Sequence, residues 1–406
     1  MLFIITFFLI FGWKINFILD ISAITATVLA VQYLYIHKQF IFLKRNPPTL
    51  GLSLLVLYSI IIVLLTGITD FTPILRSGRA LIMLIASFAL FNLYKRHYKQ
   101  PIQKICFHIY SSIIIHAVIM ISMYSYAPLR LFIYSITHAA DYANPNSPFL
   151  EGFRICGLTY GLSQTSLLQI FGLMLTPFLL NSIKEISKKI FIFISFPLIL
   201  ISSILGGRSG LFIYILLLPL YIILKLSISR FSKKNIFSFF KTISICLITF
   251  SIIYALAYNY LPTKFISSNL YKCQEIIRTF KLKGQALELL IPMYFLPNDL
   301  NTALFGKGNY GRTNAFYILS DVGWIRSIYA IGFIGLAFMV YPFIWGICSA
   351  FKQRNHLGEI AIAAIIIFIS SMLLNCKELA LLTRNQWTIQ AILLCILSAN
   401  NNKESS

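Results

Sequence analysis

Residues 296–335 read LPNDLNTALFGKGNYGRTNAFYILSDVGWIRSIYAIGFIG, a polar loop that runs directly into a long apolar segment. The loop carries both signs of charge, in Asp299, Lys307, Arg312, Asp321 and Arg326, together with closely spaced glycines at 306–311. The apolar part is long enough for a helix that crosses a bilayer. A charged loop that feeds such a helix is where chemistry on a membrane-bound substrate would take place.

The chain as a whole is far too apolar for a soluble globular protein. Of its 406 residues, 58% are hydrophobic and 11% are charged, whereas about a quarter of a soluble domain is charged. The net charge of +22 would indicate nucleic-acid binding in a soluble protein, but basic cytoplasmic loops explain much of it in a membrane protein. We therefore expect an all-α polytopic integral membrane protein whose partners include membrane lipids and no nucleic acid.

The seven cysteines are scattered, without CxxC spacing and without a neighbouring histidine cluster. Neither a disulfide framework nor a metal site has this pattern. The sequence therefore predicts no metal and no cofactor.

Apolar runs divide the chain into about twelve candidate spans, judged against the 17–25 residues that a crossing helix needs. They lie at residues 1–12, 15–36, 48–66, 79–94, 105–126, 158–182, 190–205, 211–224, 242–260, 321–348, 359–375 and 386–397. No internal repeat or linker interrupts this pattern. We expect one transmembrane domain over residues 1–406, with one large loop at 261–320 inside it.

Short basic loops predict the orientation of these spans. With twelve spans and a cytoplasmic N-terminus, the loops at 37–45, 95–104, 184–189, 225–241 and 351–356 all lie on the cytoplasmic face. The large loop, the segment 127–157 and the turn around Arg208 then lie on the opposite, outer face.

Arginines lie at the ends of spans on this outer face. A guanidinium matches phosphate or carboxylate with two parallel hydrogen bonds, and a charge near the bilayer is costly unless it is paired or hydrated. We therefore predict an anion site there, suited to a diphosphate headgroup. Snorkelling of the arginines to the interface, or their pairing with carboxylates, is the alternative.

Arg208 has the most specific setting, at the apex of GGRSG (206–210) between two spans. The glycines allow a tight turn, and Ser209 can cap the next helix, whose N-terminus favours anions. The sequence Arg76-Ser77-Gly78-Arg79 repeats this arrangement at another predicted helix start.

Asp321 begins the apolar run and has two interpretations. It is either an N-cap or first-turn acid that complements the helix dipole, or a general base that takes a proton from a sugar hydroxyl. Asp299, Asp141 and Glu151 are further candidates for the base.

Histidines and one amphipathic segment supply the remaining candidates. His116 lies within an apolar span and is predicted to be a core residue with satisfied hydrogen bonds, while His138 is a remote candidate in the outer loop. Residues 272–290 are amphipathic and either lie on the bilayer surface or pack on the bundle.

This pattern resembles the O-antigen polymerases of the Wzy type and, more loosely, the O-antigen ligases of the WaaL type. The resemblance rests on the topology and on four motifs: Gly207-Arg208-Ser209-Gly210, Phe305-Gly306-Lys307-Gly308, SDVGWIR at 320–326 with the glycines that follow, and RICGLTYGLSQTS at 154–166. It implies a membrane-embedded, C-type glycosyltransferase fold and an inverting, metal-independent reaction. Such a polymerase moves a growing glycan from undecaprenyl diphosphate onto an incoming lipid-linked repeat unit, at the periplasmic face of the bacterial inner membrane.

The same resemblance implies the roles of the site residues. Asp321 is the candidate base, and the candidate ligands of the diphosphate-linked oligosaccharide are Arg76, Arg79, Arg154, Arg208, Lys307, Arg312 and Arg326. A chain-length regulator protein is a candidate partner on which the sequence is silent.

Three other functions remain open at this stage. The ligases carry a His-Asn pair before the span that follows the large loop, and this chain has Thr313-Asn314 there, which favours the polymerase. A flippase would show two related halves with paired broken helices, and the sequence has neither; Asp20 is its main charge deep in a span. An anion channel would require a ring of like charges along a pore, of which the sequence gives no sign.

Overall fold

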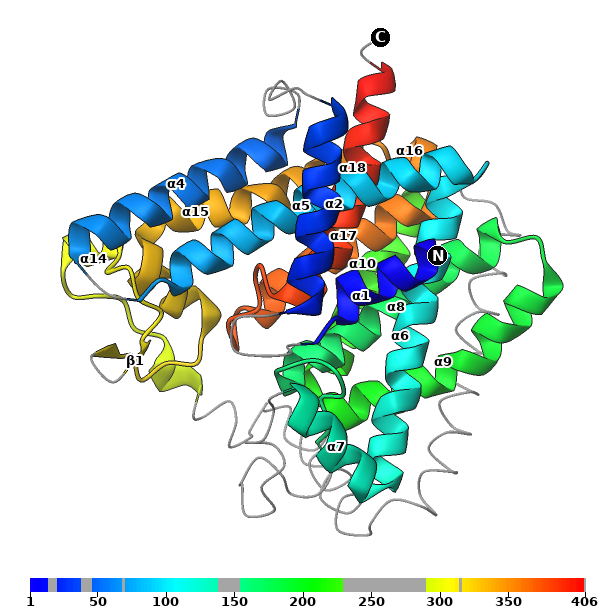
Figure 1. The fold of residues 1–406 in the computed structure, drawn as a ribbon, viewed down its shortest axis with the longest axis horizontal. Helices are drawn as coiled ribbons and strands as arrows, with labels where there is room; N and C mark the ends of the chain where they lie inside the picture. Colours follow the sequence, from blue (N-terminus) through cyan, green and yellow to red (C-terminus); the bar gives the residue numbers. More distant parts are fainter. Residues whose placement is uncertain are drawn as a thin grey trace.

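The computed structural model describes residues 1–13, 20–37, 46–67, 70–137, 154–228, 290–313 and 316–404. These residues form a bundle of helices, with one short antiparallel pairing of the strands β1 (Arg312–Thr313) and β2 (Phe316–Tyr317) in a loop (Figure 1). In this part of the chain, seven helices are long and apolar enough to cross a membrane. They are α4 (Pro47–Thr66), α5 (Thr72–His97), α6 (Pro101–Ser125), α8 (Leu162–Ser182), α9 (Ile186–Gly206), α10 (Ser209–Ile228) and α15 (Gly323–Lys352).

The remaining helices are shorter or more polar. Three short apolar helices are α1 (Leu2–Phe11), α2 (Ile21–His37) and α17 (Glu359–Leu374), and the chain ends in α18 (Arg384–Glu404). Small elements complete the set: α7 (Ala127–Thr137), η3 (Ile291–Met293), α14 (Leu300–Phe305) and α16 (Arg354–Leu357). The composition and the seven long helices together identify a helical, multi-pass membrane protein.

Each predicted span that falls within the described residues coincides with a helix, although the bounds differ. Helix α5 begins at Thr72 rather than at residue 79, with Pro73 in the first turn, where its missing N–H costs nothing. Helix α7 was not predicted. The candidate span 242–260 and residues 272–289 of the amphipathic segment lie outside the described residues, so the number of twelve spans stays a prediction.

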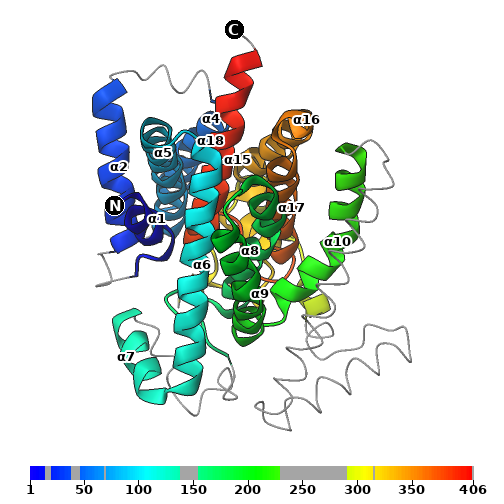
Figure 2. The ribbon, with the colours of Figure 1, turned by 90° about the vertical axis from the view of Figure 1, so that its right-hand side faces the viewer.

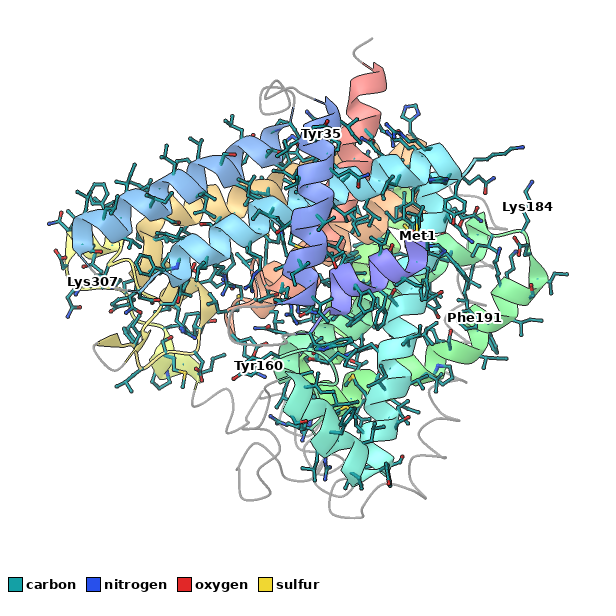
Figure 3. The ribbon with its side chains drawn as sticks, in the orientation of Figure 1. Met1, Tyr35, Tyr160, Lys184, Phe191 and Lys307 are labelled. Carbon is teal, nitrogen blue, oxygen red and sulfur yellow. The ribbon has the colours of Figure 1, made fainter. Side chains whose placement is uncertain are left out.

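Helix α8 lies at the centre of the bundle and packs against α6, α9, α10 and α17 (Figure 2). Helix α18 packs against α5 and buries Trp387, whose indole N–H donates to the carbonyl of Ala80 at 2.8 Å. An ion pair of 3.1 Å between Lys225 and Glu359 joins the end of α10 to the start of α17. Lys184 and Lys307, which the sequence assigns to opposite membrane faces, lie on opposite sides of the molecule (Figure 3).

His116 is a buried core residue, as predicted. Its ring stacks on Phe11 of α1 at a centroid distance of 4.4 Å. Nε2 accepts a hydrogen bond of 3.0 Å from the backbone N–H of Leu158, and Nδ1 lies 2.6 Å from the side-chain amide of Gln169. His116 thus ties the segment that follows Arg154 to the middle of the bundle. His138 lies outside the described residues.

Helix α15 is broken at Gly332, where the backbone adopts φ 61° and ψ −178°. The break leaves carbonyl groups just before Gly332 without their helical donors, and the glycine-spaced loop supplies hydrogen bonds to them. The N–H groups of Lys307 and Gly308 donate to the carbonyls of Tyr329 at 2.7 Å and Ala330 at 2.8 Å. The hydroxyl of Tyr58 on α4 donates to the carbonyl of Phe305 at 3.0 Å. The loop is therefore docked into a gap in a membrane helix, where its backbone groups are satisfied.

We expect Gly332→Ala to lower the thermal unfolding temperature of the purified protein. A Cβ atom at this position would overlap with the carbonyl oxygen of Leu304, and the positive φ disfavours an L-residue in addition. Gly358→Ala is the matched control, because Gly358 has a comparable backbone conformation (φ 58°, ψ −128°) but no atom within 4 Å of a Cβ position, so that only the backbone cost of about 1–3 kcal/mol applies. Equal losses from the two substitutions would contradict the docking of the loop into the break.

Candidate functional site

The segment 375–383, between α17 and α18, lies where several elements that are distant in the sequence meet. Asn375 is fully buried, and its Oδ1 accepts from the N–H groups of Ala380 at 2.9 Å and Leu381 at 3.3 Å, which closes the segment on itself. Leu382 has φ 56°, a left-handed conformation that is a strained choice for a leucine. We call residues 375–383 the connector.

Helices α8 and α15 are joined to the connector through its backbone. Gln164 at the start of α8 donates to the carbonyl of Leu379 at 3.0 Å. At the start of α15, the backbone N–H of Trp324 donates to the carbonyl of Asn375 at 3.3 Å. The phenol of Tyr294 donates to the carbonyl of Cys376. The ends of these elements are therefore held on one irregular segment.

Lys377 of the connector lies beside the first turns of two membrane helices. Its Nζ donates to Ser209, the first residue of α10, at 2.7 Å and lies 3.4 Å from the hydroxyl of Ser163 in the first turn of α8. Arg154 and Arg208 both act electrostatically on Lys377. We call Arg154, Arg208 and Lys377 the cation cluster.

The pKa of Lys377 lies below the usual lysine value. The main cause is desolvation of the ammonium by the surrounding protein, although part of the side chain remains accessible. The charge of Glu378 raises the pKa of Lys377, and the charges of Arg154 and Arg208 lower it. Three cations thus meet one carboxylate at the N-termini of two long helices, whose partial charges are also positive. The local potential favours an anion.

The turn that carries Arg208 is fixed by close packing against α8. A Cβ atom on Gly210 would lie 2.6 Å from the backbone and side chain of Ser166, so only glycine allows this approach. The hydroxyl of Ser166 donates to the carbonyl of Gly207 at 2.5 Å and accepts from the N–H of Gly210 at 3.2 Å. The N–H of Ile155 donates to the carbonyl of Leu205 at 2.8 Å, which holds the segment next to Arg154 against the end of α9.

Arg326 and Arg76 both contact the glycine-spaced loop. Arg326 is buried, and its Nε and Nη2 donate to the carbonyl of Tyr310 at 2.9 and 2.8 Å. The guanidinium of Arg76 lies over the ring of Tyr310 at 5.4 Å and donates to the carbonyl of Leu381 in the connector. Arg76 thus joins the loop to the connector, and Arg326 joins it to α15; contact with a substrate stays a prediction for both.

Arg79 of α5 and Arg384 of α18 share the carboxylate of Asp20. Arg384 Nη1 lies 2.5 Å from Asp20 Oδ2, with side-chain exposures of 12% and 4%, and Arg79 interacts electrostatically with both groups. Asp20 Oδ1 also accepts from the N–H of Ser22 at 2.9 Å, at the start of α2. Arg384 is thus paired with a carboxylate, whereas Arg79 interacts with both charges at longer range, and its contact with a substrate stays a prediction.

Asp321 is exposed and precedes α15, whose N-cap position is occupied by Val322. The hydroxyl of Ser320 accepts from the N–H of Val322 at 3.2 Å. Asp321 is thus neither the N-cap nor a first-turn acid, and its role as a base stays a prediction. Asp299, in contrast, caps α14, and its pKa is lowered by hydrogen bonds from the side chain and backbone of Thr302 and from the backbone of Asn301.

Four other predicted positions are described to different extents. Lys307 is exposed on the loop that docks into α15. Arg312 pairs through its backbone with Tyr317, and its side chain lies outside the described part of the structure. Asp141 and Glu151 lie outside it altogether.

Lys377 is the residue that the sequence-based site omits. The sequence does indicate a break in the helix at this point, because the polar segment Asn375-Cys376-Lys377-Glu378 lies between two apolar runs. Its partners Ser163 and Ser209 come from two different helices, and no local pattern indicates that they meet. Among the described residues, the connector is therefore the centre of the candidate site, and the role of the large loop stays a prediction.

Asp20→Asn should destabilise the protein more than Arg384→Gln does. Asparagine keeps the acceptor for Ser22 but leaves two partly buried arginine charges without their carboxylate, and breaking a fully buried pair costs about 3–5 kcal/mol, which is the upper bound here. Arg384→Gln leaves Asp20 beside Arg79. Lys188→Gln, which breaks an accessible pair with Glu185, is the control and should cost less than about 1 kcal/mol. Thermal unfolding in detergent measures the order, and a reversed order would contradict the sharing of Asp20.

The lowered pKa of Lys377 predicts pH-dependent binding of an anion. As the pH rises, this ammonium loses its proton earlier than an ordinary lysine, so the affinity of the purified protein for inorganic pyrophosphate should fall on the alkaline side. Lys377→Arg should shift that fall to higher pH, because a guanidinium stays charged. Calorimetric titration between neutral and alkaline pH tests this, and the same pH profile for both proteins would exclude Lys377 from the anion site.

The arrangement can bind an anion between two helix N-termini beside an irregular connector. Among the described residues, no group of three or more His, Cys, Asp or Glu side chains is placed to hold a metal ion. Comparison with known protein families and with curated proteins finds no match to this chain.

Proposed function

We propose that this protein is a polysaccharide polymerase of the O-antigen type. It transfers a growing glycan from undecaprenyl diphosphate onto an incoming lipid-linked repeat unit, at the periplasmic face of the bacterial inner membrane. The observation that carries the proposal is the cation cluster, which gathers Arg154, Arg208 and Lys377 at the starts of α8 and α10. The proposal includes a twelve-span, C-type glycosyltransferase architecture.

The cation cluster would hold the diphosphate of the donor and stabilise its charge as it leaves. Fixed cations and helix N-termini in a partly dehydrated site stabilise developing charge strongly. The lipid tail of the carrier would remain in the bilayer beside the exposed apolar face of α10. The side-chain cations can neutralise the diphosphate without a metal ion.

The transfer itself is a displacement at the anomeric carbon. A hydroxyl of the acceptor sugar attacks that carbon, the bond from carbon to the diphosphate oxygen breaks, and its electron pair leaves with undecaprenyl diphosphate. The hydroxyl proton passes to a carboxylate, for which the exposed Asp321 is the candidate. Attack from the face opposite the leaving group inverts the anomeric configuration.

The ligase and the flippase would handle the same carrier lipid. A ligase would use the cation cluster equally well, and Thr313-Asn314 in place of a His-Asn pair speaks against it. Among the described residues, the broken helix α15 is a feature that fits a transporter, since transporters bind substrates at such breaks. Here, however, the carbonyls of Tyr329 and Ala330 already accept from the loop, which favours the polymerase.

Deletion of the gene in the native bacterium should leave lipopolysaccharide with a single repeat unit on its core. A gel of the lipopolysaccharide shows this as loss of the ladder above the first band. Loss of every repeat, with polymer on the lipid carrier, would instead identify a ligase. Lipid-linked repeats in the cytoplasmic leaflet would identify a flippase.

Complementation with site variants then tests the cation cluster. Arg208→Ala and Lys377→Ala should each lower polymer formation at least tenfold, since a charge-assisted hydrogen bond contributes about 1.5–3 kcal/mol. Arg130→Ala removes an outer arginine on α7 and should restore the full ladder. Full ladders from the cluster variants at normal protein levels would exclude the cluster from the reaction.

A further inference from the structure

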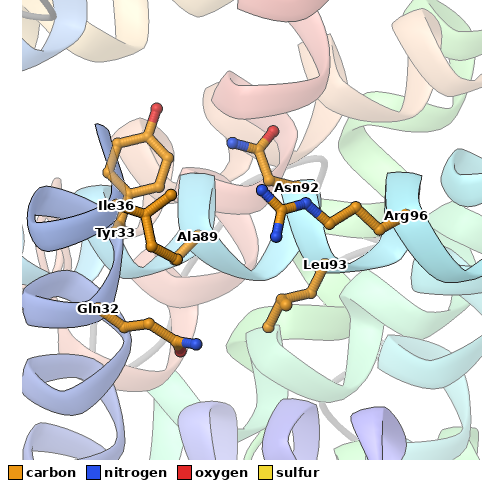
Figure 4. A pocket seen from close by; sticks show the side chains of 7 residues that line it. All are labelled: Gln32, Tyr33, Ile36, Ala89, Asn92, Leu93 and Arg96. Carbon is orange, nitrogen blue, oxygen red and sulfur yellow. The ribbon is translucent and has the colours of Figure 1, made fainter. Parts of the chain in front are cut away.

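A small hollow lies between α2 and α5, near the ends that the sequence assigns to the cytoplasmic face (Figure 4). It is distant in the sequence from the connector and shares no residue with the candidate site. Its lining comes from α2 (Gln32, Tyr33 and Ile36) and from α5 (Ala89, Asn92, Leu93 and Arg96).

The lining combines one cation with uncharged polar groups and an apolar wall. Arg96 is exposed at the end of α5, and Figure 4 shows its guanidinium turned back along the helix toward Asn92. Gln32 and Asn92 add side-chain amides, while Ile36 and Leu93 are apolar. The lining contains no carboxylate, so its charge complements an anion with an apolar body.

The neighbouring cation Lys95 is engaged elsewhere, because its ammonium lies over the ring of Phe91 at 4.7 Å. Arg96 is therefore the charge that the hollow presents. A cation in the last turn of α5 also complements the dipole of that helix, but this effect explains neither the amide of Gln32 on the facing helix α2 nor the hollow itself.

The position of Arg96 along α5 corresponds to the depth of the lipid headgroups. Arg76 and Arg96 are separated by about 30 Å along the helix, given a rise of 1.5 Å per residue. This equals the thickness of the hydrocarbon core of a bilayer. With Arg76 at the connector on one face, Arg96 lies at the opposite interface.

We infer that this hollow binds the headgroup of an anionic glycerophospholipid. The guanidinium of Arg96 binds the phosphate, and the amide of Gln32 binds one of its remaining oxygens or one of the glycerol esters, while Asn92 is hydrogen-bonded to Tyr33 across the hollow. Acyl chains lie along Ile36 and Leu93. Basic pockets between membrane helices on the cytoplasmic side suit such lipids, because that leaflet carries the anionic headgroups. This inference does not depend on the proposed function.

Native mass spectrometry of the full chain, purified in detergent, measures this binding directly. The probes are phosphatidylglycerol and phosphatidylcholine with identical acyl chains. Phosphatidylglycerol should bind in one retained copy and more tightly than phosphatidylcholine, whose positive choline group is repelled by Arg96.

Three variants separate the hollow from the general basic surface. Arg96→Gln should weaken phosphatidylglycerol binding about tenfold, the loss of one charge-assisted hydrogen bond. Leu93→Trp keeps every charge but fills the hollow, and it should weaken binding similarly. Lys99→Gln removes an exposed charge next to the hollow and should change the affinity less than twofold.

Each other pattern overturns the inference. Equal affinity for the two lipids would show that the hollow does not select an anion. Equal losses from Arg96→Gln and Lys99→Gln would show attraction by surface charge alone. Unchanged binding by Leu93→Trp would show that the lipid binds outside the hollow. Thermal unfolding of each variant confirms that it is folded.

Discussion

The structure depends on one constraint: a chain with 34 basic and 12 acidic residues must satisfy cations at the ends of apolar helices with too few carboxylates. A charge in such surroundings is costly unless it is paired or hydrated. Asp20 is the carboxylate used most fully, because it joins Arg384 of α18 to the start of α2 and interacts with Arg79 of α5. The start of α2 and the start of α18 are thereby held together.

Backbone carbonyls take the place of the missing acids. Arg326 contacts the carbonyl of Tyr310, and Arg76 contacts that of Leu381. Such carbonyls are available only where the backbone leaves the helix, because helical carbonyls are already bonded. The irregular backbone of the connector and of the loop docked at Gly332 therefore supplies the acceptors that the surplus cations need. This explains why the surplus of cations and the irregular backbone occur together.

Hydropathy predicts the helices well, because length and apolar character decide which segments cross a bilayer. It places the start of α5 too late, since Arg76 and Arg79 interrupt the apolar run while the helix continues through them. The site is less accessible to such reasoning. The sequence indicates an outer anion site with Arg154 and Arg208, but Lys377 is joined to it only by packing of α8, α10 and the connector.

The cations near the connector differ in whether an anion can displace their present hydrogen-bond partners. Arg326 is buried and chelates a carbonyl that cannot leave, so its contact is part of the fold. Lys377 remains accessible and contacts two serine hydroxyls, and a hydroxyl can give up an ammonium to a phosphate, which makes the stronger charge-assisted bond. This difference makes Arg326 part of the fold, and it supports the anion binding proposed for Lys377.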